Sequence, residues 1–247
     1  MEETPQNQSN AWKYGVVVML DALGGRTLNR QDTDDFLDRR RKFIENLKNA
    51  FCELPDSSRQ HHISEPDVFT FQDTIIISWH FGELGFKHHP EVVLPELGLW
   101  LMQAMKIGIE IGFPFRGAIA IGDYIKETNC LLGPAVSEAA SWYERADWLG
   151  IIAAPSCGHH IYRIAELCRL PKLDSYIGDR FIQYDVPLVN EGPMKLWAVS
   201  WPKAYCKPDY HGARGDFFCH LVELAVPVGT ERKYANTVNF FDHCLGI

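Results

Sequence analysis

The sequence predicts an α+β fold of the ferredoxin-like type, an antiparallel sheet with helices on one face and extra strands at its edge. Short runs rich in β-branched residues alternate with longer segments whose apolar residues recur at helical spacing. The first six of these segments follow the order βαββαβ, which is typical of a split βαβ unit. We therefore expect one sheet whose neighbouring strands run antiparallel, with two later β-rich segments that extend it.

An apolar run and an amphipathic segment predict the first strand and helix. Residues 14–20 form a β-branched run that ends at Asp21 and two glycines, as expected for a buried strand followed by a turn. Residues 32–53 carry apolar side chains at helical spacing between an Asp/Thr-rich start and Pro55. This pattern predicts a long helix.

A hairpin, a second helix and another strand complete the unit. Residues 68–81 contain two β-rich runs around a polar pair, which predicts a hairpin with its turn at Asp73. Residues 89–112 predict another long helix, and residues 115–124 another strand. The same criteria predict a helix at 135–148, a strand at 150–154, a helix at 155–168, strands at 180–185 and 194–201, and helices at 216–226 and 230–245.

Length and composition indicate a single domain with additions at both ends. The chain has 247 residues, of which 46% are hydrophobic, enough to bury a sizeable core. We expect a polar, disordered leader at residues 1–11, a main domain at 12–201 and a helical extension at 202–247.

The overall charge and the absence of targeting patterns restrict the classes of function. The net charge is -8 and the pI about 5.7, so a general basic surface for nucleic acid is not expected. The sequence contains neither a signal-peptide pattern nor an apolar run long enough for a membrane span. Seven scattered cysteines without a C-x-x-C pair favour reduced thiols. We therefore expect a cytoplasmic protein with no membrane or nucleic-acid partner.

Two aspartates are the strongest candidates for chemistry. Asp21 follows the first predicted strand and Asp73 lies at the turn of the next hairpin, so strand pairing would bring both carboxylates together. Neighbouring carboxylates repel each other unless a positive charge joins them, and Mg²⁺ binds one or two carboxylates together with phosphate oxygens and water. Taken singly, each aspartate also fits an ordinary cap or turn residue. Their joint placement favours a metal site, and removing either carboxylate is then expected to leave the fold intact.

Four segments resemble the class III nucleotidyl cyclases and occur in that family's order. Residues 19–27 (MLDALGGRT) are similar to the first metal motif, and residues 71–74 (FQDT) to the hairpin of the second metal aspartate. Residues 116–122 (RGAIAIG) resemble the strand that follows, and residues 133–140 (GPAVSEAA) the next turn and helix. The resemblance covers about residues 13–200.

This resemblance implies a metal-dependent cyclase. Asp21, Asp73 and the backbone carbonyl of Ala22 would bind two Mg²⁺ or Mn²⁺ ions, and backbone N–H groups near Gly24 and Gly25 would approach the triphosphate. The ribose 3′-hydroxyl would attack the α-phosphorus of the same nucleotide and release pyrophosphate. The family's arrangement also implies a head-to-tail homodimer, in which each chain helps to hold the nucleotide of its partner.

Several positions depart from the family's pattern. Gln72 stands where a glycine is usual, and the two base-reading positions are Phe69 and Cys130. The Asn and Arg of the next helix fall on Ser137 and Ser141, and the late phosphate-binding Lys has no counterpart. For this chain we assign catalytic roles to Ser137 and Arg145, and substrate contacts to Phe69, Arg116 and Cys130.

The departures favour a base other than adenine. The chain looks like the pyrimidine cyclases of bacterial Pycsar anti-phage systems, which implies synthesis of cUMP or cCMP for a separate effector protein. Phe36 and Arg40 lie one turn apart on the first long helix, where an aromatic ring and a guanidinium suit uracil and its carbonyl groups. We therefore expect UTP to be preferred over CTP. Phe36 fits a core residue and Arg40 a surface charge equally well.

Other classes of function remain open. An adenylate or guanylate cyclase is the nearest alternative. A relative of polymerase palm domains or diguanylate cyclases would also place two carboxylates on such a sheet, but the hairpin at Gln72 and Asp73 lacks a Gly-Gly-Asp/Glu-Glu-Phe turn. A degenerate, non-catalytic cyclase fold that binds a nucleotide or a protein partner would account for the missing Asn, Arg and Lys.

Overall fold

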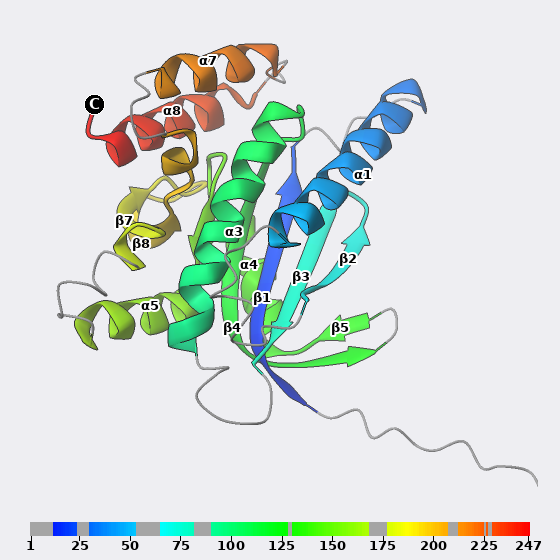
Figure 1. Cartoon of the computed structure of the whole chain (residues 1–247), viewed down its shortest axis with the longest axis vertical. Helices are drawn as coiled ribbons and strands as arrows, with labels where there is room; N and C mark the ends of the chain where they lie inside the picture. The colour runs from blue at the N-terminus through cyan, green and yellow to red at the C-terminus, as the bar shows by residue number, and fades with distance from the viewer. Residues whose placement is uncertain are drawn as a thin grey trace, which may run out of the picture.

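An eight-stranded sheet runs through the computed structural model of the chain, with helices packed against it (Figure 1). The structure describes residues 12–23, 30–52, 65–81, 90–127, 130–167, 177–206, 212–224, 226 and 229–247. The strands are β1 (Lys13–Ala22), β2 (Asp67–Phe71), β3 (Thr74–His80), β4 (Phe115–Glu127), β5 (Cys130–Leu132), β6 (Ile151–Ala153), β7 (Phe181–Val186) and β8 (Met194–Val199). The helices include α1 (Arg30–Cys52), α3 (Pro90–Glu110), α4 (Pro134–Tyr143), α5 (Pro155–Leu167), η3 (Trp201–Tyr205), α7 (Ala213–Glu223) and α8 (Glu231–Leu245).

The sheet confirms the predicted βαββαβ unit and its extension. Strands β4, β1, β3 and β2 lie side by side in that order, and each neighbouring pair is antiparallel. Strand β6 pairs with β4 in parallel, and β8 and β7 follow in antiparallel pairs. The short strand β5 forms a hairpin with the end of β4. The α+β fold is therefore as predicted.

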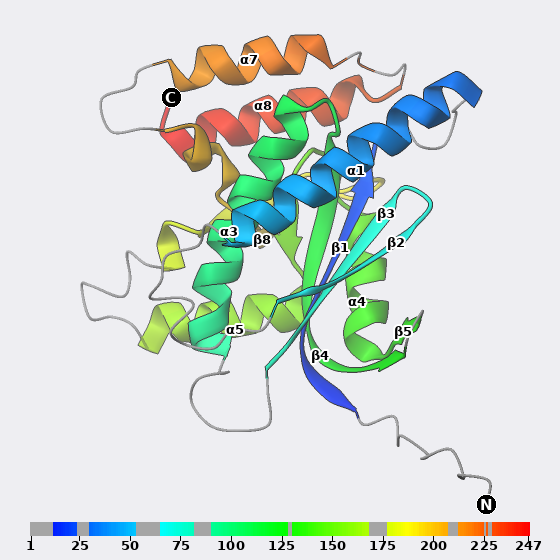
Figure 2. The same ribbon diagram turned by 45° about the vertical axis from the view of Figure 1, so that its right-hand side comes forward.

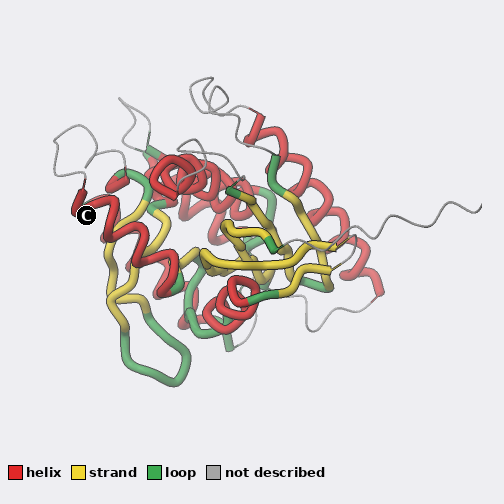
Figure 3. Tube along the Cα trace, turned by 90° about the horizontal axis from the view of Figure 1, so that it is seen from below, coloured by secondary structure: helices red, strands yellow, loops and turns green. Residues whose placement is uncertain are grey.

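Both faces of the central strand β1 are buried, because helices cover the sheet from two sides (Figures 2 and 3). Val16, Val18 and Leu20 pack in the core beneath α1 and α3. Val17 and Met19 face the other way and pack with α4. Two-sided burial explains why this strand is a continuous apolar run without polar alternation. Helices α1 and α3 share one face as predicted, whereas α4 lies on the opposite face, so the expectation that helices cover only one face of the sheet was wrong.

The segment after α4 is the main difference from the predicted elements. A helix was expected at 135–148, but α4 ends at Tyr143 and the chain turns at the next two residues. Ala146 forms a β-bridge with Leu188, and Trp148 is fully buried in the core. Tertiary packing therefore overrides the helical pattern of this segment. Strand β5 and helix η3 were not predicted, since three to five residues are too few to show a period.

Helices α7 and α8 continue the core of the sheet into the extension. Trp201, Phe217, Phe240 and Phe241 are each 0% exposed and belong to the same hydrophobic cluster as β1. The rings of Phe217 and Phe241 stack with centroids 4.2 Å apart. Residues before and after the predicted boundary at 201 thus share one core.

The predicted leader at residues 1–11 and the pair Gly24 and Gly25 lie outside the described residues. No helix in the part of the chain that the structure describes is long and apolar enough to cross a bilayer.

Candidate active site

A cleft of about 1030 Å³ opens where the ends of β1 and β3 meet the first half of α1. Asp21 and Asp73 both line it, as the sequence predicted for two neighbouring carboxylates. The α1 side of the cleft carries Thr33, Phe36, Leu37 and Arg40, and the end of α4 contributes Tyr143 and Glu144. The size suits a nucleotide, since small-molecule sites typically occupy about 300–1000 Å³.

Asp21 lies at the buried end of β1, between two partner strands. It is opposite Thr74 of β3 and Arg116 of β4 in the sheet register. Its Oδ2 accepts a hydrogen bond from Arg116 Nε at 3.0 Å, and the two residues are only 5% and 7% exposed. The carboxylate is therefore neutralised by a side chain from within the same sheet.

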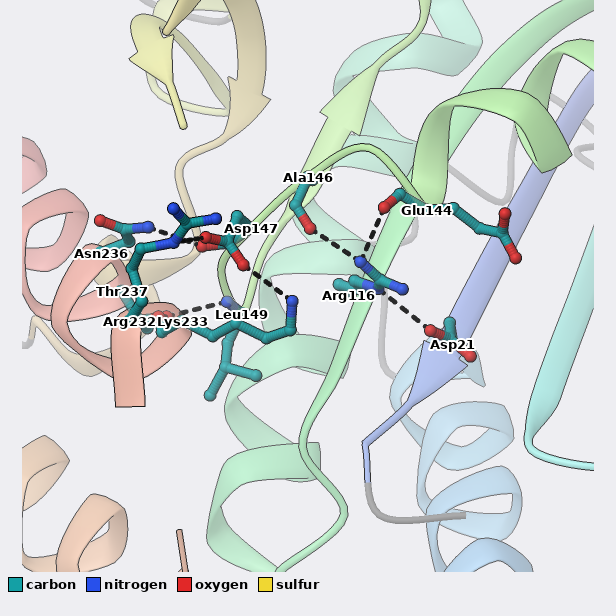
Figure 4. Close-up of polar contacts among 10 residues, drawn as sticks. All are labelled: Asp21, Arg116, Glu144, Ala146, Asp147, Leu149, Arg232, Lys233, Asn236 and Thr237. Carbon is teal, nitrogen blue, oxygen red and sulfur yellow. Dashed lines mark hydrogen bonds and ion pairs between the residues drawn. The ribbon is translucent and has the colours of Figure 1, made fainter. Parts of the chain in front are cut away.

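Arg116 is held in place by the turn that follows α4. Its Nη1 donates to the carbonyl oxygens of Glu144, at 2.8 Å, and Ala146, at 3.0 Å (Figure 4). These bonds and the ion pair use different sides of one planar guanidinium, so its orientation is fixed. Arg116 was predicted to contact substrate, and the structure places it behind Asp21.

Asp73 lies on the two-residue turn of the β2–β3 hairpin. Its carbonyl accepts a hydrogen bond from the backbone N–H of Ala22 at 3.0 Å, which ties the turn to the end of β1. The preceding residue, Gln72, has a φ of 53°, a left-handed conformation that costs a non-glycine residue about 1 kcal/mol. Arg40 Nη1 donates to the Gln72 carbonyl at 2.7 Å and supports this conformation. The hairpin thus brings Asp73 to the cleft without a glycine at the left-handed position.

The donor set suits a hard divalent cation. Asp21 and Asp73 both line the cleft, and the backbone N–H of Ala22 binds the Asp73 carbonyl. Among the described residues, no group of three or more His, Cys, Asp or Glu side chains is placed to hold a metal. Mg²⁺ commonly binds through one or two carboxylates and takes its other oxygens from phosphate and water, so two aspartates fit this role.

Tyr143 is a cleft residue that sequence reasoning missed. Its hydroxyl donates to Glu144 Oε1 at 3.3 Å. Burial raises the pKa of the phenol, and the negative charges of Asp21 and Glu144 raise it further. The side chain therefore stays protonated at neutral pH and presents a donor to the cleft. Nothing in the local pattern distinguishes it from an ordinary helix residue, because its position depends on where α4 ends.

Phe36 and Arg40 both line the cleft, and both also make contacts that serve the fold. The Phe36 ring packs against Phe113 with centroids 5.3 Å apart, and Arg40 binds the hairpin turn. The structural role is therefore observed for both residues, and the role in base binding stays a prediction.

Four other predicted residues do not line this cleft. Phe69 packs with the core on the α4 face, and Cys130 lies in β5 opposite Glu127, at the other end of β4 from Arg116. Ser137 is exposed on α4. Arg145 binds both carboxylate oxygens of Glu191, at 2.9 and 2.7 Å, and its guanidinium lies 4.3 Å from the centroid of the Trp142 ring. Within one chain these residues are separate from Asp21 and Asp73.

Comparison with known proteins gives matches among solved structures. No family model matches the sequence. No curated protein matches it either.

Nucleotide cyclases are among the structures that resemble this chain. The catalytic core of a rhodopsin-guanylyl cyclase with converted specificity, in complex with ATPαS, is 13% identical, with a TM-score of 0.46 over 76% of this chain and 96% of that one. An adenylate/guanylate cyclase/hydrolase from Silicibacter pomeroyi is 18% identical, with a TM-score of 0.45 over 76% and 97%. The guanylyl cyclase Cya2 is 12% identical, with a TM-score of 0.42 over 77% and 93%.

Proposed function

We propose that the chain is a metal-dependent nucleotidyl cyclase. The observation that carries this proposal is that Asp21, at a strand end, and Asp73, on a hairpin turn, both line one nucleotide-sized cleft. Such a pair is suited to in-line displacement at phosphorus, where two ions activate the attacking oxygen and stabilise the leaving one. Asp21, Asp73 and the Ala22 carbonyl would hold these Mg²⁺ or Mn²⁺ ions.

The reaction forms one P–O bond and breaks another. The ribose 3′-oxygen of the nucleotide attacks its own α-phosphorus, and the bond to the bridging oxygen of the leaving pyrophosphate breaks. The cleft residues bind and orient the nucleotide, and Tyr143 contributes a protonated hydroxyl. Because the nucleophile belongs to the substrate, no side chain has to form a covalent intermediate.

We further propose a pyrimidine substrate, with UTP preferred over CTP. Phe36 and Arg40 lie together on the α1 wall, where a ring can pack against a base and a guanidinium can reach a carbonyl. Uracil offers two carbonyl acceptors, whereas cytosine replaces one with an amine. A role in anti-phage defence, with the cyclic nucleotide activating a separate effector, follows from the resemblance to Pycsar cyclases.

A homodimer completes this proposal. Ser137 lies on α4 and Arg145 follows it, and both are separate from Asp21 and Asp73 of the same chain. In their proposed roles they would therefore act in the active site of the partner chain. The exposed large apolar side chains include Phe71, at 69% on the hairpin, and Leu132, at 64% on β5. A mixture of Asp73→Ala and Arg145→Ala chains should then regain activity that neither has alone. Light scattering that finds a fully active monomer would contradict the dimer.

A non-catalytic nucleotide-binding protein is the second candidate. The buried ion pair of Asp21 and Arg116 favours it, because this pairing alone gives Asp21 a structural reason to be present. The two candidates differ in turnover and agree in binding.

One experiment separates them. The purified protein is incubated with Mn²⁺ and each of the four ribonucleoside triphosphates, and the products are identified by mass spectrometry, with Asp73→Ala as the inactive control. A 3′,5′-cyclic mononucleotide formed by the wild type and absent from the control supports the cyclase. A dinucleotide product indicates a palm-like enzyme, and nucleotide binding without turnover supports the second candidate. Efficient turnover of ATP or GTP would overturn the pyrimidine preference.

A further inference from the structure

Helix α8 makes hydrogen bonds and ion pairs to residues 144–149, the segment that follows α4. The Asp147 carboxylate, 6% exposed, is bound by Arg232 Nε and, at 2.8 Å, by Lys233 Nζ. Asn236 Nδ2 donates to the Asp147 carbonyl at 2.8 Å, and Thr237 Oγ1 accepts from the backbone N–H of Leu149 at 2.8 Å. The helix thus binds this short segment through side chain and backbone at once.

The same segment holds Arg116. The carbonyls of Glu144 and Ala146 accept from Arg116 Nη1, immediately before the residue that α8 binds. Arg116 in turn donates to Asp21. Figure 4 shows these contacts as a continuous series from α8 to the end of β1.

The Asp147 side chain is buried, whereas that of Arg232 is 67% exposed. Burial by itself raises the pKa of Asp147, but the hydrogen bonds and charges of Lys233 and then Arg232 outweigh it and lower the pKa. The carboxylate therefore stays charged at neutral pH and keeps its ion pairs with Lys233 and Arg232 of α8.

We infer that α8 positions Asp21 through residues 144–149 and Arg116. Asp147 and Thr237 are then positioning residues for the Asp21 carboxylate, the proposed metal ligand. The inference rests on the proposed function, in which Asp21 is a metal ligand. Residues behind a ligand commonly set its orientation, and their loss lowers metal affinity or activity by about 10–100-fold. The donors of a guanidinium are fixed in one plane, so a shift of the carbonyls bound by Arg116 Nη1 would also shift the Nε–H that binds Asp21.

A purely structural role for α8 predicts something different. Weakening α8 would then lower the stability of the whole chain and leave metal binding by the folded fraction unchanged. The matched control is Arg214→Gln, which breaks the ion pair from α7 to Asp242 of α8, 2.8 Å between Nε and Oδ1, and leaves the contacts to 144–149 in place.

The test uses the full chain with Thr237→Val, which keeps the side-chain shape but removes the acceptor for Leu149. Asn236→Ala is the second variant if Thr237→Val does not fold. Mn²⁺ binding without nucleotide is measured by the electron paramagnetic resonance signal of free Mn²⁺, and the Arg116 Nε–H group is followed by ¹⁵N NMR. Thermal melting reports stability.

The expected result is about tenfold weaker Mn²⁺ binding and a shifted Arg116 Nε–H resonance in Thr237→Val, with both unchanged in Arg214→Gln. In turnover, the half-saturating Mn²⁺ concentration should rise while the KM for the nucleotide stays the same. Wild-type Mn²⁺ binding and an unshifted Arg116 resonance in a folded Thr237→Val protein would overturn the inference. If the wild type neither binds Mn²⁺ nor turns over nucleotide, the proposed function fails, and the inference about a metal ligand fails with it. If Mn²⁺ binds only together with nucleotide, the half-saturating Mn²⁺ concentration in turnover decides the inference. If the wild type binds Mn²⁺ without turnover, only the catalytic proposal fails and the same comparison decides the inference.

Discussion

The two aspartates of the cleft are held in very different ways. Asp21 is buried in a strand and paired with Arg116, which α8 secures from behind through the 144–149 segment. Asp73 is half-buried on a hairpin turn, which is held by a backbone hydrogen bond from Ala22 and by the Arg40 contact to Gln72. The Asp21 carboxylate is therefore part of the core, and Asp73 lies on a turn at the edge of the sheet. The same chemical group can thus be essential to the fold in one place and dispensable to it in the other.

Replacing each aspartate with alanine tests this contrast and should give the largest effects. Asp21→Ala leaves the Arg116 charge buried without its partner, so we expect a loss of about 3–5 kcal/mol in the free energy of unfolding. Asp73→Ala should change that free energy by less than about 0.5 kcal/mol while abolishing turnover. Urea denaturation and a turnover assay on both variants measure these changes. Equal stabilities would show that the ion pair contributes nothing.

Removing both charges of the buried pair sharpens the comparison. A double variant, Asp21→Leu with Arg116→Met, replaces the pair with apolar side chains, and such replacements are often neutral or stabilising. We expect it to recover most of the stability lost in Asp21→Ala, as measured by urea denaturation, and to remain inactive. A double variant as unstable as the single one would mean that the backbone contacts of Arg116 matter more than its charge.

Arg40→Ala tests the support of the β2–β3 turn and should have an intermediate effect on stability and turnover. Losing the hydrogen bond to Gln72 is expected to cost about 1 kcal/mol and to loosen the turn that carries Asp73. If Arg40 also reads the base, UTP turnover should fall much more than residual CTP turnover. A combination with Gln72→Gly, which removes the left-handed strain, should restore stability without restoring the UTP preference. Equal losses with both nucleotides would assign Arg40 to the turn alone.

The α8 anchor should give the smallest effect on stability, seen as a change in the pH dependence of unfolding in acid. The pKa of Asp147 is lowered in the folded state, so its contribution to stability is present above the unfolded pKa, ordinarily about 3.9, and is lost as the pH falls through the folded value. The free energy of unfolding should therefore decrease below about pH 4. This limb should be shallower in Asp147→Asn, whose side chain does not titrate. Melting temperatures between pH 3 and 6 measure the difference, and identical pH profiles would exclude Asp147 as its source.

The sequence predicted the sheet and the pair of aspartates better than it predicted their surroundings. Strand β1 and helix α1 differ from their predicted bounds by at most two residues, because long apolar or amphipathic runs carry a clear period. The end of α4 at Tyr143 could not be predicted, since it depends on the burial of residues far along the chain from it. That ending decides where the carbonyls that bind Arg116 lie.

We expected that either aspartate could be removed without harm to the fold. For Asp21, the premise of this expectation was wrong. It assumed two unneutralised carboxylates, whereas Arg116, 95 residues away in sequence, already neutralises Asp21. A register that aligns Asp21 with Arg116 across β1 and β4 is a long-range property of the sheet. No local motif contains it.

The shared core has a practical consequence for anyone who would express the main domain alone. A fragment that stops at residue 201 would uncover the aromatic surface that Phe217, Phe240 and Phe241 now cover around Trp201. Contiguous exposed apolar surface of this kind promotes aggregation. The fragment should accumulate as insoluble protein in the producing cell, so crystallisation and screening efforts need the chain to extend through α8.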